Sequence, residues 1–220
     1  MSALAYAERP AGGGEADGLL VLHHGRGADE HDLLALGSEL DPQRRLRVFT
    51  PRAPLKLPGS SGYHWYVVPR VGYPDHDTFF AAYTRLAEFH DELWQRTGIP
   101  PRRTVLGGFS MGSVMSYALA FGADRPAPAG VMAFSGFIPT VDGWLPSLGD
   151  RAEVRAFIAH GRNDPVIDVE FAARARAGLT AAGLNVDYHE SHVAQHQIDP
   201  AHIPAGVDWL GVTLPQRGLS

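Results

Sequence analysis

The sequence predicts an α/β fold with a single, mostly parallel central sheet flanked by helices on both faces. Short apolar runs alternate with longer segments of helical periodicity from Gly18 onward, which is typical of this architecture. A chain of 220 residues suffices for one domain with a substantial core, and no linker or repeat divides it. We therefore expect one domain over residues 1–220. Residues 1–17 contain three consecutive glycines and are expected to form a loose N-terminal arm.

Six apolar runs are expected to form the strands. The first, LLVL at residues 19–22, is apolar throughout, as in a buried strand. The runs lie at residues 19–22, 47–50, 104–106, 131–134, 154–159 and 185–188.

Helical periodicity is strongest over residues 77–97, where Asp77 suits the N-cap and Gly98 the C-terminal end. Further helices are expected near Asp32 and over residues 111–121, 169–182 and 203–210. Residues 51–74 are rich in Pro, Gly and aromatic side chains. They predict a long loop, and long loops in compact domains often carry function.

Composition excludes several classes of protein. Cysteine is absent, which rules out disulfides, thiolate metal sites and a cysteine nucleophile. The net charge is −5 and no basic run occurs, so nucleic-acid binding is not expected. Residues 1–18 lack the features of a secretion signal, and no apolar segment could span a bilayer. These absences favour a cytoplasmic protein without stable membrane insertion.

The most informative motif is G-F-S-M-G at residues 108–112. In a G-x-S-x-G turn the serine lies on a sharp bend between a strand and a helix, where flanking glycines avoid clashes. An apolar strand precedes this motif and a helical pattern follows it, as the motif requires. Ser110 is therefore the expected nucleophile of a serine hydrolase. The alternative is an ordinary strand-to-helix turn.

The order of an α/β-hydrolase triad along the chain is Ser, then Asp or Glu, then His. Asp164 directly follows a predicted strand and is the favoured acid. Its rival, Asp168, is better explained as a helix cap. His196 lies in the loop before the last helix, where it could take the serine proton. His192 is the alternative base.

A histidine-glycine turn after the first predicted strand can point backbone N–H groups at an oxyanion. The N–H groups of Arg26 and Met111 are the candidates for this oxyanion hole. The alternative is an ordinary glycine-containing loop.

Several motifs together resemble the phospholipase/carboxylesterase family, which includes acyl-protein thioesterases and small bacterial carboxylesterases. In chain order they are HGRGADEHDL at residues 24–33, GFSMG at 108–112, SGF at 135–137, HGRNDPVI at 160–167, and His196. The resemblance covers residues 19–210. It implies a Ser110–Asp164–His196 triad, an oxyanion hole at Arg26 and Met111, and hydrolysis of carboxylic esters or thioesters without a cofactor.

The sequence departs from the thioesterases of this family after the nucleophile, where many carry glutamine and this chain has Met111. This departure concerns substrate specificity and leaves the backbone donor in place. We expect a carboxylesterase acting on small-molecule esters, with thioesterase or lysophospholipase activity as the alternative. An inactive hydrolase fold that binds a ligand is an alternative of another class. Family analogy also allows a homodimer.

No metal-ligand spacing connects His23, His24 and His31, so no metal site is predicted, and His24 is assigned to the oxyanion turn. Residues 135–154 are too few for a large lid domain. Loops should then wall the substrate pocket, and Trp65, Tyr66 and Phe137 are the expected apolar walls. Packing of these aromatic side chains in the core is the alternative.

Overall fold

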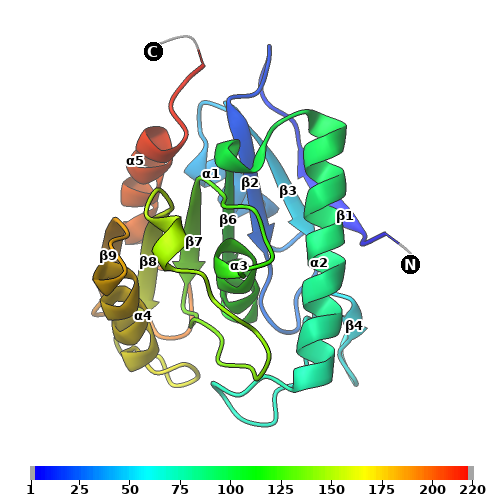
Figure 1. The fold of residues 1–220 in the computed structure, drawn as a ribbon, viewed down its shortest axis with the longest axis vertical. Helices are drawn as coiled ribbons and strands as arrows, with labels where there is room; N and C mark the ends of the chain where they lie inside the picture. Colours follow the sequence, from blue (N-terminus) through cyan, green and yellow to red (C-terminus); the bar gives the residue numbers. More distant parts are fainter. Residues whose placement is uncertain (1–2, 218–220) are drawn as a thin grey trace.

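The computed structural model describes residues 3–217, which form a seven-stranded sheet covered by helices on both faces (Figure 1). The strand order is β1-β3-β2-β6-β7-β8-β9, and all neighbouring strands are parallel except the β1–β3 pair. The sheet strands are β1 (Tyr6–Arg9), β2 (Gly18–His23), β3 (Leu46–Pro51), β6 (Thr104–Phe109), β7 (Gly130–Phe134), β8 (Arg155–Gly161) and β9 (Val186–Ser191).

Five α-helices pack on this sheet in the described part of the chain. They are α1 (Leu34–Leu40), α2 (His76–Thr97), α3 (Met111–Phe121), α4 (Glu170–Ala181) and α5 (Ile203–Thr213). Figure 1 shows α3 across the sheet with α2 and α4 on either side of it. Helices α1 and α5 cover the opposite face, where their side chains join a separate apolar cluster.

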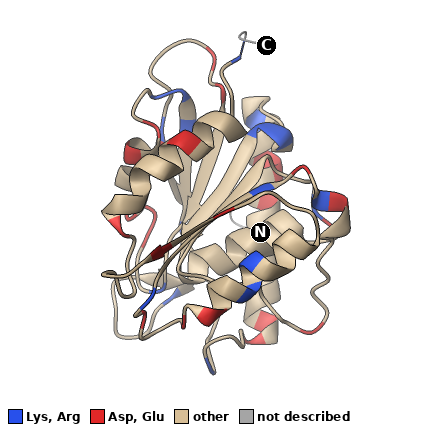
Figure 2. Ribbon diagram, turned by 90° about the vertical axis from the view of Figure 1, so that its left-hand side faces the viewer, with Lys and Arg blue, Asp and Glu red and all other residues tan. Residues whose placement is uncertain are grey.

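The alternation of side chains along each strand builds the two apolar layers. Leu19 and Val21 of β2 belong to the apolar cluster that contains residues of α2, α3 and α4, whereas Leu20 and Leu22 belong to the cluster that contains residues of α1 and α5. Both sets are fully buried, which is why the run from 19 to 22 is apolar throughout. Charged residues lie mainly on helices and loops around this sheet (Figure 2).

The N-terminal segment is more ordered than the sequence predicted. Tyr6–Arg9 form β1, an antiparallel edge strand whose residues pair with Val48–Pro51 of β3. The prediction of a loose arm over residues 1–17 is therefore wrong for this part, and residues 1–2 lie outside the described chain. Arg47 of β3 binds Glu8 of β1 across the pair, with Nη2 and Oε1 2.6 Å apart.

The predicted bounds of α3 match the structure, and those of α2 differ by one residue at its start. The N-cap of α2 is Asp75, whose Oδ1 accepts the backbone N–H of Thr78 at 3.0 Å, so the assignment of this cap to Asp77 is wrong. At the other end Gly98 adopts a left-handed conformation (φ 68°) and closes the helix, as predicted.

Two connections shape the site. The predicted loop at residues 51–74 contains a short hairpin, β4 (Leu55–Lys56) with β5 (Tyr63–His64), and otherwise runs without regular structure to α2. Residues 135–154, between β7 and β8, contain only the one-turn helix η2 (Gly149–Arg151), so no large lid covers the sheet within the described residues. None of the helices in residues 3–217 combines the length and apolar character needed to cross a membrane.

Strands β2 and β6 are neighbours, yet the chain leaves them toward opposite sides of the sheet. Such a reversal opens a crevice at the carboxyl ends of the strands, which is where ligands bind in open α/β sheets. The G-F-S-M-G motif spans the end of β6 and the start of α3, and the His24-Gly25 turn follows β2. Both predicted catalytic turns therefore lie at this crevice.

Candidate active site

Ser110 lies on the sharp turn between β6 and α3. Its backbone has φ 54° and ψ −120°, a conformation that a non-glycine residue rarely adopts. The flanking glycines are required by close backbone approach: a Cβ on Gly112 would lie 1.9 Å from the His23 carbonyl oxygen. A Cβ on Gly108 would lie 2.6 Å from the carbonyl carbon of Gly112. The glycines of the motif thus let α3 begin directly against the end of β2.

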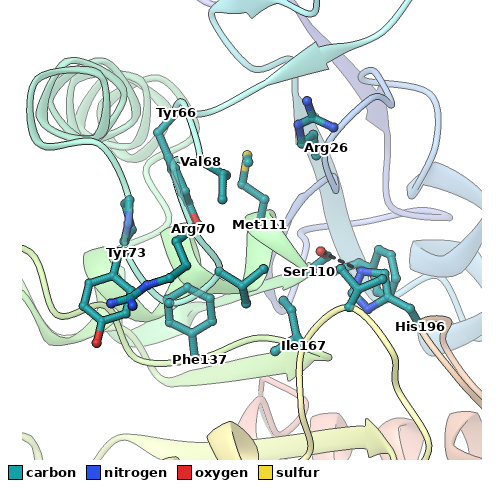
Figure 3. Close-up of a pocket in the computed structure, with 15 residues that line it drawn as sticks. Arg26, Tyr66, Val68, Arg70, Tyr73, Ser110, Met111, Phe137, Ile167 and His196 are labelled. Atoms are coloured by element: carbon teal, nitrogen blue, oxygen red, sulfur yellow. Dashed lines mark hydrogen bonds between the residues drawn. The ribbon is translucent and has the colours of Figure 1, made fainter.

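The imidazole of His196 reaches the serine from the loop after β9. Its Nε2 lies 2.9 Å from Ser110 Oγ, and its Nδ1 lies 2.7 Å from Asp164 Oδ2 (Figure 3). Because the carboxylate only accepts, Nδ1 carries the proton and Nε2 can accept the serine hydroxyl proton. Phe109 packs beside the imidazole, with ring centroids 5.0 Å apart. The structure therefore brings Ser110, His196 and Asp164 into one hydrogen-bonded chain.

Asp164 is oriented by the loop after β8. Its Oδ1 accepts the backbone N–H groups of Val166 (2.8 Å) and Ile167 (2.9 Å), which leaves Oδ2 for His196. Burial raises the pKa of Asp164, but the hydrogen bonds from His196 and from these two N–H groups outweigh it and hold the pKa below its usual range. Asp164 is therefore a carboxylate at neutral pH.

The alternative acid, Asp168, and the alternative base, His192, lie outside this hydrogen-bonded chain. The N-cap residue of α4 is Val169, not Asp168 as predicted, but Asp168 Oδ1 accepts the backbone N–H of Glu170 at 2.8 Å, so its carboxylate is engaged at the start of this helix. The ring of His192 lies 3.3 Å from the guanidinium of Arg162, on the surface.

His160 is a residue that the sequence reasoning did not assign. It is buried at the end of β8, and its Nε2 lies 2.8 Å from the carbonyl oxygen of Ile167 and 3.3 Å from Asp164 Oδ2. The ring therefore braces the loop that holds the acid. Its place in the HGRNDPVI segment, four residues before Asp164, was the available signal.

The two candidate oxyanion donors flank the serine. Met111 is the first residue of α3, and the N–H groups of a first helical turn have no partner within the helix. Arg26 follows the turn after β2, and both residues line the cavity beside Ser110. This helix N-terminus also favours a developing negative charge.

His24 holds the oxyanion turn in shape, as predicted. Its Nε2 accepts the backbone N–H of Ala53 at 3.0 Å, so Nδ1 carries the proton and donates to the Gly25 carbonyl oxygen at 2.7 Å. Burial lowers the pKa of His24, which favours this neutral ring. His24 thereby ties the turn after β2 to the chain after β3.

A cavity of about 500 Å3 opens beside Ser110. Tyr66 and Phe137 line it, in agreement with their predicted role as apolar walls. Trp65 does not: its side chain is fully buried, and its indole Nε1 donates to the His24 carbonyl oxygen at 2.9 Å. The prediction of Trp65 as a pocket wall is therefore wrong, and the packing alternative holds for this residue.

Other wall residues were missed. They come from the loop before α2 and from the loop that holds Asp164, and are Val68, Arg70, Val71, Tyr73, Val166 and Ile167. The sequence indicated that residues 51–74 form a functional loop, but which of its side chains face the cavity depends on its irregular backbone.

No group of three His, Asp or Glu side chains that could hold a metal ion occurs within residues 3–217. His23 is instead buried behind the site, where its Nδ1 lies 2.8 Å from Ser116 Oγ and its Nε2 lies 3.3 Å from His90 Nε2. His31 is exposed.

The buried His23–His90 pair predicts a loss of stability in acid. Burial lowers the pKa of His90 to about 3, with charge repulsion from Arg125 adding to the effect, and burial lowers the pKa of His23 well below 6.5. Below pH 6.5 the unfolded chain binds protons that the folded protein excludes. The free energy of unfolding then falls by up to about 1.4 kcal/mol per pH unit for each histidine.

Replacing His90 with Phe should therefore flatten the dependence of stability on pH by about 1.4 kcal/mol per unit between about pH 6 and pH 4. Urea unfolding at a series of pH values measures this slope, with His31→Gln as the control that removes an exposed imidazole. The prediction would be contradicted if the free energy of unfolding of His90→Phe changed with pH at the same slope as that of the wild-type protein.

The sequence and this fold have known counterparts. The family model described as Phospholipase/Carboxylesterase matches residues 5–210. The chain belongs to the phospholipase/carboxylesterase family. The resemblance inferred from the motifs and the α/β-hydrolase fold are both confirmed, and the chain is a hydrolase of the ester-cleaving kind.

Related proteins of this family include esterases and thioesterases. Lysophospholipase-like protein 1 of Mus musculus is 26% identical over 202 residues, which are 88% of this chain and 83% of the relative. Acyl-protein thioesterase 1 of Debaryomyces hansenii is 30% identical over 171 residues, 73% of each chain.

Two crystal structures show the same fold. That of esterase PE8 is 28% identical and has a TM-score of 0.80, with 97% of this chain and 100% of the other covered. The Bacillus cereus carboxylesterase is 22% identical and has a TM-score of 0.81, with 96% and 94% covered.

Proposed function

We propose that this protein hydrolyses small-molecule carboxylic esters through an acyl-enzyme on Ser110. The observation that carries the proposal is the chain of two hydrogen bonds from Ser110 Oγ through His196 to Asp164, at 2.9 and 2.7 Å. An imidazole in this position can take the serine proton as Oγ attacks the ester carbonyl. Asp164 keeps the proton of the neutral imidazole on Nδ1, and it stabilises the imidazolium that forms when Nε2 takes the serine proton.

The N–H groups of Arg26 and Met111 then stabilise the oxyanion of the tetrahedral intermediate, where a single donor contributes about 2.7–4 kcal/mol. His196 returns its proton to the alkoxide as the bond between the carbonyl carbon and the leaving oxygen breaks. A water molecule, deprotonated by His196, attacks the acyl-enzyme. Collapse of the second intermediate breaks the bond to Oγ, returns the proton to the serine and releases the carboxylic acid.

The same chemistry serves thioesters and lysophospholipids, and relatives named acyl-protein thioesterase and lysophospholipase-like protein keep these alternatives open. The cavity of about 500 Å3, with no large lid over it in the described residues, supports an ester of short to medium chain length. A hydrolase fold used only for binding is disfavoured, because it would have no need to keep Ser110 in hydrogen-bond contact with His196. The single domain, the cytoplasmic location and the homodimer stay predictions from sequence and family analogy.

A substrate panel tests the proposal. Esters, thioesters and lysophospholipids with the same acyl groups are compared by kcat/KM, with release of the free acid as the readout. We expect the small esters to have the highest kcat/KM and to show an acyl-chain optimum. A higher kcat/KM for thioesters or lysophospholipids would favour the corresponding alternative, and no release of acid from any member would favour the binding protein.

A further inference from the structure

The cavity beside Ser110 differs in charge from the protein around it. The protein has a net charge of −5, yet among the described residues that line the cavity the members of the Lys, Arg, Asp and Glu types are two arginines, Arg26 and Arg70. No Asp or Glu among the described residues lines it. Most of the remaining walls are apolar. A mostly apolar cavity with unneutralised positive charge suits an elongated ligand that carries a negative group.

Arg70 is held in place but has no acidic partner. Its guanidinium carbon lies 3.7 Å from the centroid of the Tyr73 ring, and the N–H of Tyr73 donates to the Arg70 carbonyl oxygen at 3.0 Å. The base of this loop is closed by the Asp75 N–H, which donates to the Val67 carbonyl oxygen at 3.0 Å. No carboxylate within residues 3–217 lies within 4.0 Å of its guanidinium nitrogens, whereas Arg47 and Arg125 each bind one. The guanidinium of Arg70 is thus oriented and available to an anion from outside the chain.

The position of Arg70 relative to Ser110 and His196 places it on the acyl side of a bound ester. In Figure 3, Ser110 lies between His196 on one side and Phe137, Arg70 and Tyr73 on the other. His196 protonates the leaving alcohol, so the leaving group lies on the side of His196. The acyl chain then extends along the cavity toward Arg70.

The surface beyond His196 has the opposite character. A second hollow there is lined by His196 and Phe109 together with the carboxylates of Asp32 and Glu39, and no Lys or Arg of the described chain lines it. An anionic leaving group would be repelled by these carboxylates. The two hollows together favour a negative charge on the acyl side only.

We propose that the preferred acyl group carries a carboxylate at its far end, so that the substrate is a monoester of a dicarboxylic acid. The inference rests on the proposed function, because the roles of Ser110 and His196 define the acyl side. Val68, Phe137 and Ile167 contact the methylene chain, and Arg70 binds the terminal carboxylate, with a planar fork of donors that matches it.

The test compares two series of 4-nitrophenyl esters, one with a terminal carboxylate and one with a terminal carboxamide of the same size. The chains are long enough to prevent attack of the free carboxylate on its own ester. We expect the wild-type protein to favour the carboxylate series by about tenfold in kcat/KM, mainly through KM, because the contact stabilises ground and transition states alike. The preference should decrease as ionic strength rises.

In Arg70→Gln the ratio of the two kcat/KM values should fall to about one. Arg102→Gln is the matched control, since it removes an exposed arginine in helix η1 (Pro101–Arg103), before the start of β6 and outside the cavity. It should keep the wild-type ratio. A ratio near one in the wild-type protein, or the wild-type ratio in Arg70→Gln, would overturn the inference.

A third arm places the negative charge on the other side of the ester. Neutral acyl esters of 4-hydroxybenzoate carry their carboxylate on the leaving group and should be poorer substrates than the corresponding esters of 4-hydroxybenzamide. A preference for the benzoate would contradict the assignment of the acyl side. If the neutral esters are hydrolysed without any preference for carboxylate, the inference fails and the proposed function stands. If no ester is hydrolysed at all, the proposed function fails first.

Discussion

Ser110→Ala is expected to reduce ester turnover by about 10⁵- to 10⁶-fold, because no other group in the site can form the acyl-enzyme. The fold should survive the change. The serine Oγ accepts no backbone N–H at the start of α3, and loss of one hydrogen bond to His196 costs about 1 kcal/mol. For a chain of this size that shifts Tm by about 2–4 °C. Initial rates of ester hydrolysis and a thermal melt measure the two effects.

A neighbouring serine provides the matched control. Ser113 Oγ is buried in α3, accepts the N–H of Phe134 at 3.0 Å and lies 2.5 Å from the Gly108 carbonyl oxygen. Ser113→Ala leaves buried backbone groups without this partner, so it should lower Tm more than Ser110→Ala does while retaining most of the turnover. Substantial turnover by Ser110→Ala, above that of a mock purification, would contradict the assignment of the nucleophile.

Asp164→Asn is expected to lower kcat by about 10⁴-fold. The Asn side-chain oxygen can still accept the N–H groups of Val166 and Ile167, so the loop should keep its shape. The amide group that then faces His196 Nδ1 is a donor, which forces the imidazole proton onto Nε2. An imidazole with this tautomer cannot take the proton of Ser110.

Asp168→Asn makes the same chemical change four residues away. The Asn side-chain oxygen can accept the same N–H of Glu170, so α4 should begin as before, and turnover should stay within about threefold of the wild-type value. Steady-state kinetics of the two variants on one ester separate the two carboxylates. Equal losses, or a larger loss in Asp168→Asn, would show that the acid has been assigned to the wrong residue.

Much of this site could be predicted because its geometry depends on glycines and on strand ends. The bend at Ser110 needs backbone contact with the end of β2, which only glycine at positions 108 and 112 allows. An apolar run followed by such a turn therefore marks one edge of the sheet. The carboxyl ends of parallel strands meet at that edge, so a carboxylate after β8 and a histidine after β9 are brought near the serine.

The incorrect predictions concern choices that sequence periodicity does not determine. β1 is a short edge strand of partly exposed residues, and it forms because Val48–Pro51 of β3 leave an unpaired edge. Asp75 and Asp77 are both acidic, and the cap falls to Asp75 because its backbone is extended there (φ −63°, ψ 129°).

Trp65 and Tyr66 are adjacent aromatic residues in an irregular loop. Only Tyr66 lines the cavity, since the indole of Trp65 is committed to a hydrogen bond with the His24 carbonyl. Which of two such neighbours faces a cavity follows from the path of the loop, which depends on contacts with distant parts of the chain.

The nucleophile can be located chemically in the folded protein. The folded protein is treated with a fluorophosphonate, which phosphonylates an activated serine hydroxyl, and the adduct is mapped by mass spectrometry of its peptides. We expect one adduct, on Ser110, with loss of ester turnover in proportion to labelling and no adduct in Ser110→Ala. An adduct on another serine, or full labelling of Ser110 with turnover intact, would contradict this expectation.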